Sequence, residues 1–138
     1  MKENKNIFIQ AFLWLSIFMI FGVLDRSHYL GGWIYHNKNF YIILAVIAII
    51  ITIFNKNIGY FMTLGNICGL ICGRFIGDYI KYKNILKITA ETSAAEEYFL
   101  RSHKGFFIWI LCIIISILIA CLIEIIKKIL NNKNKIKI

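Results

Sequence analysis

The sequence lacks proline altogether and has few acidic residues. The absence of proline from its 138 residues excludes proline kinks from any helix it forms. Only seven Asp and Glu accompany sixteen Lys and Arg, which gives a formal net charge of +9. The basic residues do not form one stripe; they stand between apolar runs and in the last dozen residues. That distribution is typical of a membrane protein near anionic lipid headgroups, so we expect no nucleic-acid partner.

Motifs of common catalytic and cofactor-binding sites are also missing. No GxGxxG, P-loop or HExxH pattern occurs, and no segment repeats. The four cysteines lie inside apolar runs without CxxC or zinc-ligand spacing, so we interpret them as packing residues. We expect neither a cofactor nor a metal. The first apolar run leads into Asp25 and Arg26 without a small-residue cleavage site, which predicts a retained helix rather than a signal peptide.

Apolar residues dominate what is present. They make up 59% of the chain and its mean hydropathy is +0.71, whereas soluble domains are about 45–50% apolar. A membrane core about 30 Å thick needs about 20 helical residues. The run lengths predict an all-α fold, an integral membrane four-helix bundle forming a single transmembrane domain over residues 1–138. The predicted spans are 7–24, 40–54, 58–80 and 106–126, followed by a basic tail at 127–138.

The connections between these spans differ in length. Residues 55–57 are so few that the second and third spans must be antiparallel neighbours. The first connection, 25–39, is predicted to be a loop. In the third connection, Ser93 and Glu96 have capping-box spacing, and Glu97 and Arg101 can pair at i,i+4. We therefore expect a short amphipathic helix near 93–103, lying along the membrane surface.

The distribution of lysine and arginine suggests an orientation. With four spans, both termini and the second connection share a side, which carries eight Lys and Arg against seven on the other. The positive-inside rule then places both termini in the cytoplasm of a cell whose membrane the chain crosses several times. The usage of Ile, Lys and Asn suggests a bacterial host with an AT-rich genome.

A glycine ladder in the third span is the most specific pattern. Gly65, Gly69, Gly73 and Gly77 recur every four residues and share one slowly winding helix face, as in a glycine zipper. Glycine permits close backbone approach, on which helix association in lipid depends. The fourth span offers small residues at the same spacing, Cys112, Ser116 and Ala120, and is our preferred partner. The second span, a second copy of the chain, or a partner membrane protein are the alternatives.

Polar residues gather at the end of the bundle that carries the first and third connections. Asn66, Leu70, Arg74 and Asp78 form a stripe beside the glycines, and Arg74 can pair with Asp78. The candidate polar site comprises Asp25, Arg26, His28, His36, Arg74, Asp78, Glu96, Arg101 and His103. Aromatic residues at the same end, including Tyr41 and Trp109, are interpreted as an interfacial belt.

Three chemistries are considered at this polar end. Histidines with a carboxylate bind zinc, but the spacing of His28, His36 and His103 matches no ligand pattern. A histidine with Asp78 or Glu96 has the residue types for acid–base catalysis, without a nucleophile motif. Arginines suit an anionic group such as a lipid phosphate, and Arg26, Arg74 and Arg101 are the candidates. The remaining interpretation is that these are solvated loop charges or interfacial residues.

The leading functional hypothesis is a non-enzymatic membrane protein that acts through helix packing. It would be an accessory or assembly subunit of a larger complex, or a homo-oligomer, in contact with anionic lipid headgroups. The first alternative is a small transporter or channel subunit, which requires Arg74 and Asp78 to line a wet cavity. The second is a membrane enzyme, which requires a histidine within hydrogen-bond reach of a carboxylate in a cleft.

Overall fold

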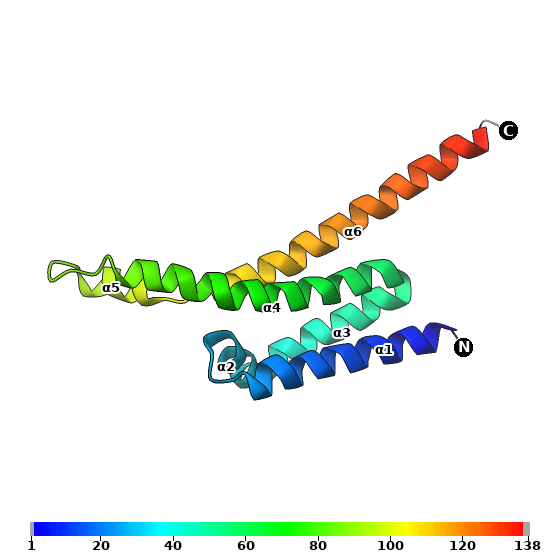
Figure 1. Cartoon of the computed structure of the whole chain (residues 1–138). Helices are drawn as coiled ribbons and strands as arrows, with labels where there is room; N and C mark the ends of the chain where they lie inside the picture. The colour runs from blue at the N-terminus through cyan, green and yellow to red at the C-terminus, as the bar shows by residue number, and fades with distance from the viewer. Residues whose placement is uncertain (1, 137–138) are drawn as a thin grey trace.

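The computed structural model describes residues 2–136, and these are all-helical, which confirms the predicted class. Figure 1 shows the helices lengthwise, with the beginning of α1 and the end of α6 at the same end of the molecule. The elements are α1 (Lys2–Ile17), the π-helix η1 (Phe18–Leu24), α2 (Tyr29–His36), α3 (Lys38–Phe54), α4 (Lys56–Ile85), α5 (Ala94–Arg101) and α6 (Gly105–Ile136).

Within the described residues, three segments are long and apolar enough to cross a membrane: Asn4–Leu24, Lys56–Ile85 and Gly105–Asn132. They correspond to the first, third and fourth predicted spans. The second prediction, 40–54, falls on α3, which has 17 residues. Helices α2 and α3 pass the same criteria only as a pair, and they are bent by 85° at their junction. The described chain therefore has three helices able to span a membrane, or four possible spans if α2 and α3 together form one.

The first connection was predicted to be a loop, and this is wrong. It contains α2, whose Leu30 and Ile34 are buried in the core. The chain turns into α2 after the π-helix η1, where the Asp25 N–H donates to the Ile20 carbonyl oxygen at 3.1 Å. Two adjacent glycines and several polar residues lower the helix propensity of this segment, so only its burial against the other helices makes it helical.

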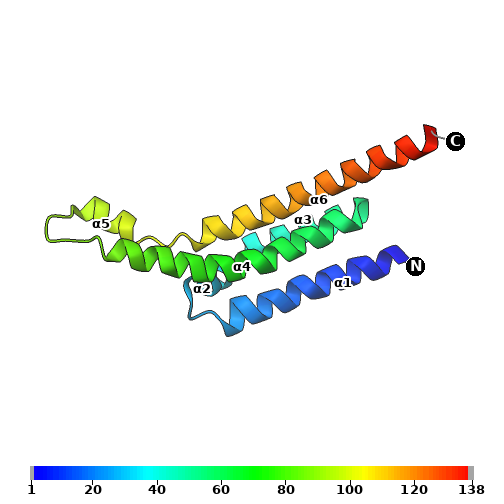
Figure 2. The same cartoon turned by 45° about the horizontal axis from the view of Figure 1, so that its top comes forward.

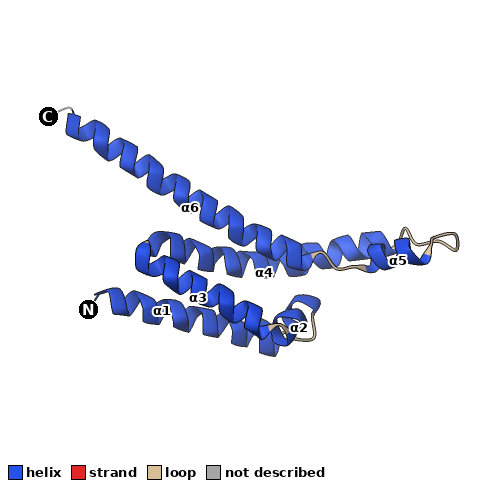
Figure 3. Ribbon diagram, turned by 180° about the vertical axis from the view of Figure 1, so that it is seen from behind, coloured by secondary structure: helices blue, strands red, loops and turns tan. Residues whose placement is uncertain are grey.

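The short helix expected near 93–103 is present as α5. Its cap is the one expected, because the Ser93 hydroxyl oxygen accepts from the Glu96 N–H at 3.3 Å. Arg101 pairs with Glu97 across one turn at 2.7 Å. Figure 3 shows α5 running back beside the projecting end of α4 rather than across the end of the bundle. The helix that does turn sharply across that end is α2 (Figure 2).

Helix α6 continues beyond the predicted fourth span. It runs through the basic tail at 127–138 as far as Ile136, and residues 137–138 lie outside the described chain. No proline or glycine follows Gly105 in this sequence to stop the helix, and lysines near a helix C-terminus interact favourably with its dipole.

Helix α4 is the central element, and its glycine face lies against α6. A methyl group added at Gly69 would stand 2.7 Å from the Trp109 carbonyl oxygen, and one added at Gly73 would stand 2.6 Å from that of Gly105. Both distances are too short for any Cβ, so the two backbones touch here only because glycine has no side chain. At Gly65 the neighbours are Cys112 and Ser116 of α6. The groove is thus filled from within the same chain.

We predict that Gly69→Leu lowers the free energy of unfolding by about 3 kcal/mol, because the new side chain meets helix backbone that cannot move aside. Reversible unfolding in mixed detergent micelles, followed by far-UV circular dichroism, measures the loss. Cys68→Leu is the matched control, since Cys68 is exposed on the neighbouring position and should change stability by less than about 0.5 kcal/mol. Equal losses of unfolding free energy in the two variants would contradict a contact between α4 and α6 that depends on the glycine face.

Candidate functional site

One group of the predicted polar residues surrounds the Arg74 guanidinium. Arg74 projects from α4 toward the turn between η1 and α2, where Asp25 accepts from its Nη1 at 2.8 Å. Its Nη2 lies 2.7 Å from the His28 Nε2. Arginine only donates, so His28 Nε2 must be the acceptor and the ring is neutral, with its proton on Nδ1. The same Nε2 lies 3.6 Å from the Asp25 carboxylate, so the three side chains form one group.

A second group is built on His103, just before α6 begins. Its Nδ1 accepts from the Gly105 N–H at 2.9 Å, which satisfies one of the free amides at the start of α6. Its Nε2 then carries the proton and donates to the Asp78 carboxylate at 2.9 Å. The ring stacks on Tyr29 with centroids 4.2 Å apart and is buried. Both ring nitrogens are occupied.

The predicted pairing of Arg74 with Asp78 is not what the structure shows. Although the two residues are four apart on one helix, each turns to a partner on a different element: Asp25 before α2, and His103 before α6. The two contacts measure 2.8 Å and 2.9 Å. Sequence spacing alone favoured the local pair because the path of the first connection was predicted as a loop.

The other candidate residues are not part of either group. Arg26 lies over the Tyr35 ring at 5.5 Å, Arg101 pairs with Glu97, and Glu96 and His36 are exposed. The three arginines proposed for an anionic group therefore each have separate partners. Among the described residues, no three His, Cys, Asp or Glu side chains are grouped so that they could hold a metal ion.

A buried polar network in the middle of the molecule was not predicted. Asn66 of α4 is fully buried; its Oδ1 accepts from Trp109 Nε1 at 2.8 Å, and its Nδ2 donates to the Tyr41 hydroxyl at 3.1 Å. The Tyr41 hydroxyl donates in turn to the Trp14 carbonyl oxygen at 3.2 Å. These bonds connect α6, α4, α3 and α1 in sequence. Tyr41 and Trp109, interpreted above as belt residues, are instead core residues.

The same network continues toward the start of α4. The Thr63 hydroxyl oxygen accepts from Trp14 Nε1 at 2.9 Å and from Gln10 Nε2, and it donates to the Gly59 carbonyl oxygen at 3.2 Å. Gln10 Nε2 also donates to Gly59 at 3.0 Å. The signal in the sequence was an amide or hydroxyl within each apolar run, which is costly in lipid unless it is paired inside the protein.

These contacts connect neighbouring elements. The Arg74 group joins α4 to the turn before α2, the His103 group joins α4 to the start of α6, and the interior network is directed at hydroxyl, backbone and indole groups of neighbouring helices. Comparison with protein-family models, with curated proteins and with solved structures gives no match for this chain.

We predict opposite tautomers for the two engaged histidines. In ¹⁵N spectra of the histidine-labelled chain at neutral pH, His28 should carry its proton on Nδ1 and His103 on Nε2, because each ring accepts at the other nitrogen. Histidine-to-glutamine variants assign the signals. His36, which is exposed, serves as the control and should show exchange-averaged shifts. The same tautomer at both positions would contradict the hydrogen bonds described above.

We predict that Asn66→Leu lowers the free energy of unfolding by about 1–3 kcal/mol, since it leaves the Trp109 Nε1–H buried without an acceptor. Micelle unfolding followed by circular dichroism measures the change. The double variant Asn66→Leu/Trp109→Phe removes donor and acceptor together, so its loss should be smaller than the sum of the two single losses. Strict additivity would show that the two side chains do not interact.

Proposed function

We propose that the chain is a small multi-pass membrane protein that does no chemistry and acts through helix packing, as an accessory or assembly subunit. The observation that carries this proposal is the contrast between its outer and inner surfaces. The buried side chains Asn66, Thr63 and His103 are hydrogen-bonded to neighbouring elements, whereas the outer faces of the long helices are apolar. Such a molecule is suited to lipid as its solvent and to other membrane helices as partners.

The exposure of large apolar side chains supports placement in a membrane. Phe8 on α1, Leu24 on η1, Phe54 on α3 and Phe75 on α4 are each more than 60% exposed, and α6 carries a similar outer surface. Monomeric soluble proteins rarely expose apolar patches larger than a few hundred Å². Lipid would cover these faces along the whole length of the helices.

The spacing of the charged residues along the helices also supports placement in a membrane. Lys5 and Asp25 delimit the apolar part of α1, and Lys104 and Glu124 delimit that of α6. Each interval is about 20 residues, the length that crosses about 30 Å of hydrocarbon. From Lys56, the same length along α4 ends near Gly77, beside the Arg74 and His103 groups. The ion pairs then lie at one headgroup level and both termini at the other, which we place in the cytoplasm.

The two alternative functions, an enzyme and a transporter, require side chains that are free to contact a substrate. The enzyme alternative needs a histidine near a carboxylate, and Asp78–His103 has that contact, but neither ring nitrogen of His103 is free to take a substrate proton. The transporter alternative needs Arg74 beside an open path, whereas its guanidinium is held between Asp25 and His28. No observation on these residues favours either activity over a packing role.

The length of α6 supports an assembly role. This helix has 32 residues, about 48 Å, and so exceeds the hydrocarbon thickness by several turns. A hydrogen bond from Asn57 Nδ2 to Glu124 at 2.8 Å joins it to the start of α4. Beyond it, Ile129 and Leu130 are more than half exposed on a segment that projects from the bundle (Figure 1). Because the glycine groove is filled, this projecting segment is the surface we assign to a partner or a second copy.

We predict that the chain extracted from its own membranes in mild detergent runs as an assembly larger than its 16.1 kDa monomer, and that Ile129→Ser/Leu130→Ser shifts it to the monomer. The reason is that association would bury the apolar surface of this segment, and burial stabilises by about 25 cal/mol per Å². Light scattering with detergent correction measures the mass.

The matched control is Asn131→Ser/Asn132→Ser on the next two positions, which should leave the assembly unchanged. A monomeric wild-type chain would contradict the assembly role, and its release from membranes by alkaline carbonate without detergent would contradict the membrane placement. Unchanged association in the Ile129→Ser/Leu130→Ser variant would exclude the projecting segment as the contact surface.

A further inference from the structure

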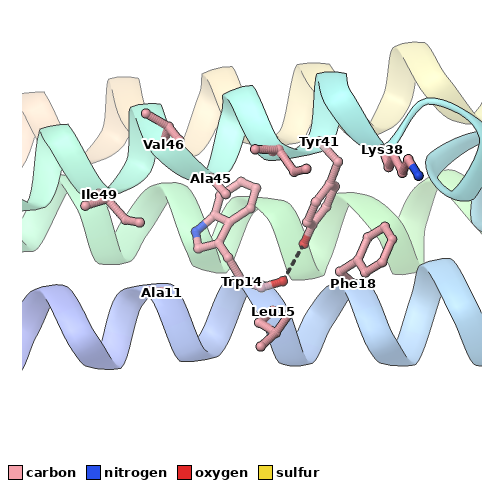
Figure 4. A pocket seen from close by; sticks show the side chains of 10 residues that line it. Ala11, Trp14, Leu15, Phe18, Lys38, Tyr41, Ala45, Val46 and Ile49 are labelled. Atoms are coloured by element: carbon pink, nitrogen blue, oxygen red, sulfur yellow. Dashed lines mark hydrogen bonds between the residues drawn. The ribbon is translucent and has the colours of Figure 1, made fainter.

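An open groove runs between α1 and α3, away from the glycine face where α4 contacts α6. Figure 4 shows Ala11, Trp14 and Phe18 on one wall and Ala45 and Ile49 on the other, with Lys38 at one end. The groove has a volume of about 360 Å³ and an almost wholly apolar lining. Each wall includes an alanine, Ala11 or Ala45, where a larger side chain would narrow the groove. The Tyr41–Trp14 hydrogen bond at 3.2 Å ties the two helices together beside it.

The length and the lining of the groove indicate its occupant. From Lys38 to Ile49 it follows α3 for about 16 Å, which is half of a 30 Å hydrocarbon core, or one leaflet. A continuous apolar lining of that length matches one acyl chain of a phospholipid.

The charge at the end of the groove indicates the headgroup. Lys38 is exposed in the first turn of α3, at the level where the Arg74 and His103 groups also lie. No acidic residue stands in that first turn, and none of the ion pairs among the described side chains involves Lys38. Its charge and the positive end of the α3 dipole are therefore both available to an anion.

We propose that this groove binds an anionic phospholipid, with one acyl chain between α1 and α3 and the phosphate at Lys38. The inference rests on the membrane placement proposed above and on no particular partner. The acyl chain would complete the packing of α1 against α3, which touch less closely than α4 and α6 do. The lipid would thus act as a structural component of the bundle at one leaflet.

Native mass spectrometry of the full chain in mild detergent tests this proposal. The chain is supplied with phosphatidylglycerol or with phosphatidylcholine of the same acyl composition. Wild type should retain about five times more phosphatidylglycerol, the factor expected for about one lysine charge near a surface, and Lys38→Gln should abolish the preference. Ala45→Phe fills the groove and should remove the retained lipid of both kinds. Ile43→Phe is the matched control, because Ile43 is exposed on α3 but does not line the groove.

A second variant and a second measurement keep the test decisive. Ala11→Leu narrows the groove from α1 and replaces Ala45→Phe if that variant does not fold, as judged by circular dichroism. Phosphatidylglycerol brominated at mid-chain should quench the fluorescence of Trp14 in wild type and less in the filled variants. Equal retention of the two lipids by wild type, or wild-type retention by folded Ala45→Phe and Ala11→Leu, overturns the proposal. Loss of self-association in those variants with lipid retention unchanged would assign the groove to a partner helix instead.

Discussion

The contact of the α4 and α6 backbones along the glycine face is the constraint from which most other positions follow. In lipid there is little hydrophobic drive between helices, so association depends on short-range packing and on hydrogen bonds that the protein supplies itself. The glycines let the axes approach until Gly69 and Gly73 meet carbonyl oxygens of α6. That approach sets Trp109 beside Asn66 and brings His103 under Asp78. A wider separation would leave each of these polar groups without its partner.

The interior hydrogen bonds then select one arrangement of helices. Asn66, Tyr41 and Trp14 connect α6 to α1 through α4 and α3, and each bond fixes the height of one helix against the next. An apolar interface would tolerate sliding by a turn, whereas these donors and acceptors pair in a single register. The Arg74–Asp25 and Asp78–His103 contacts add the same control at the end of the molecule where α2 lies. The polar residues inside this chain thus specify how its helices pack.

Run length and spacing predicted the helical class, the positions of the long apolar helices, and the capped helix α5, because each depends on local sequence. The glycine ladder and the small residues of α6 were likewise visible as periodic patterns, and the structure places them against each other. Helix α2 could not be predicted, since its helicity depends on burial of Leu30 and Ile34 by distant residues. The partners of Arg74 and Asp78 were missed for the same reason: both come through connections whose path only tertiary structure defines.

The location of Tyr41 and Trp109 shows a further limit of prediction from sequence. Aromatic residues with a polar atom are common at membrane interfaces, and sequence alone gives no means of telling such a residue from one that donates inside the protein. The distinction required knowing that Asn66 faces both of them. Gln10 and Thr63 carried the corresponding signal, as isolated polar residues in apolar runs whose partners lie on other helices.

Because the chain is synthesised from its N-terminus, the contact between α4 and α6 forms last. Synthesis completes α1 to α4 while α6 is still unmade, and the ladder of glycines on α4 then has no cover. During that interval Asn66 lacks the Trp109 indole and Asp78 lacks the His103 ring. The last helix to emerge is therefore the one that closes the polar interior, and a nascent chain interrupted before Gly105 would leave the glycine face of α4 uncovered.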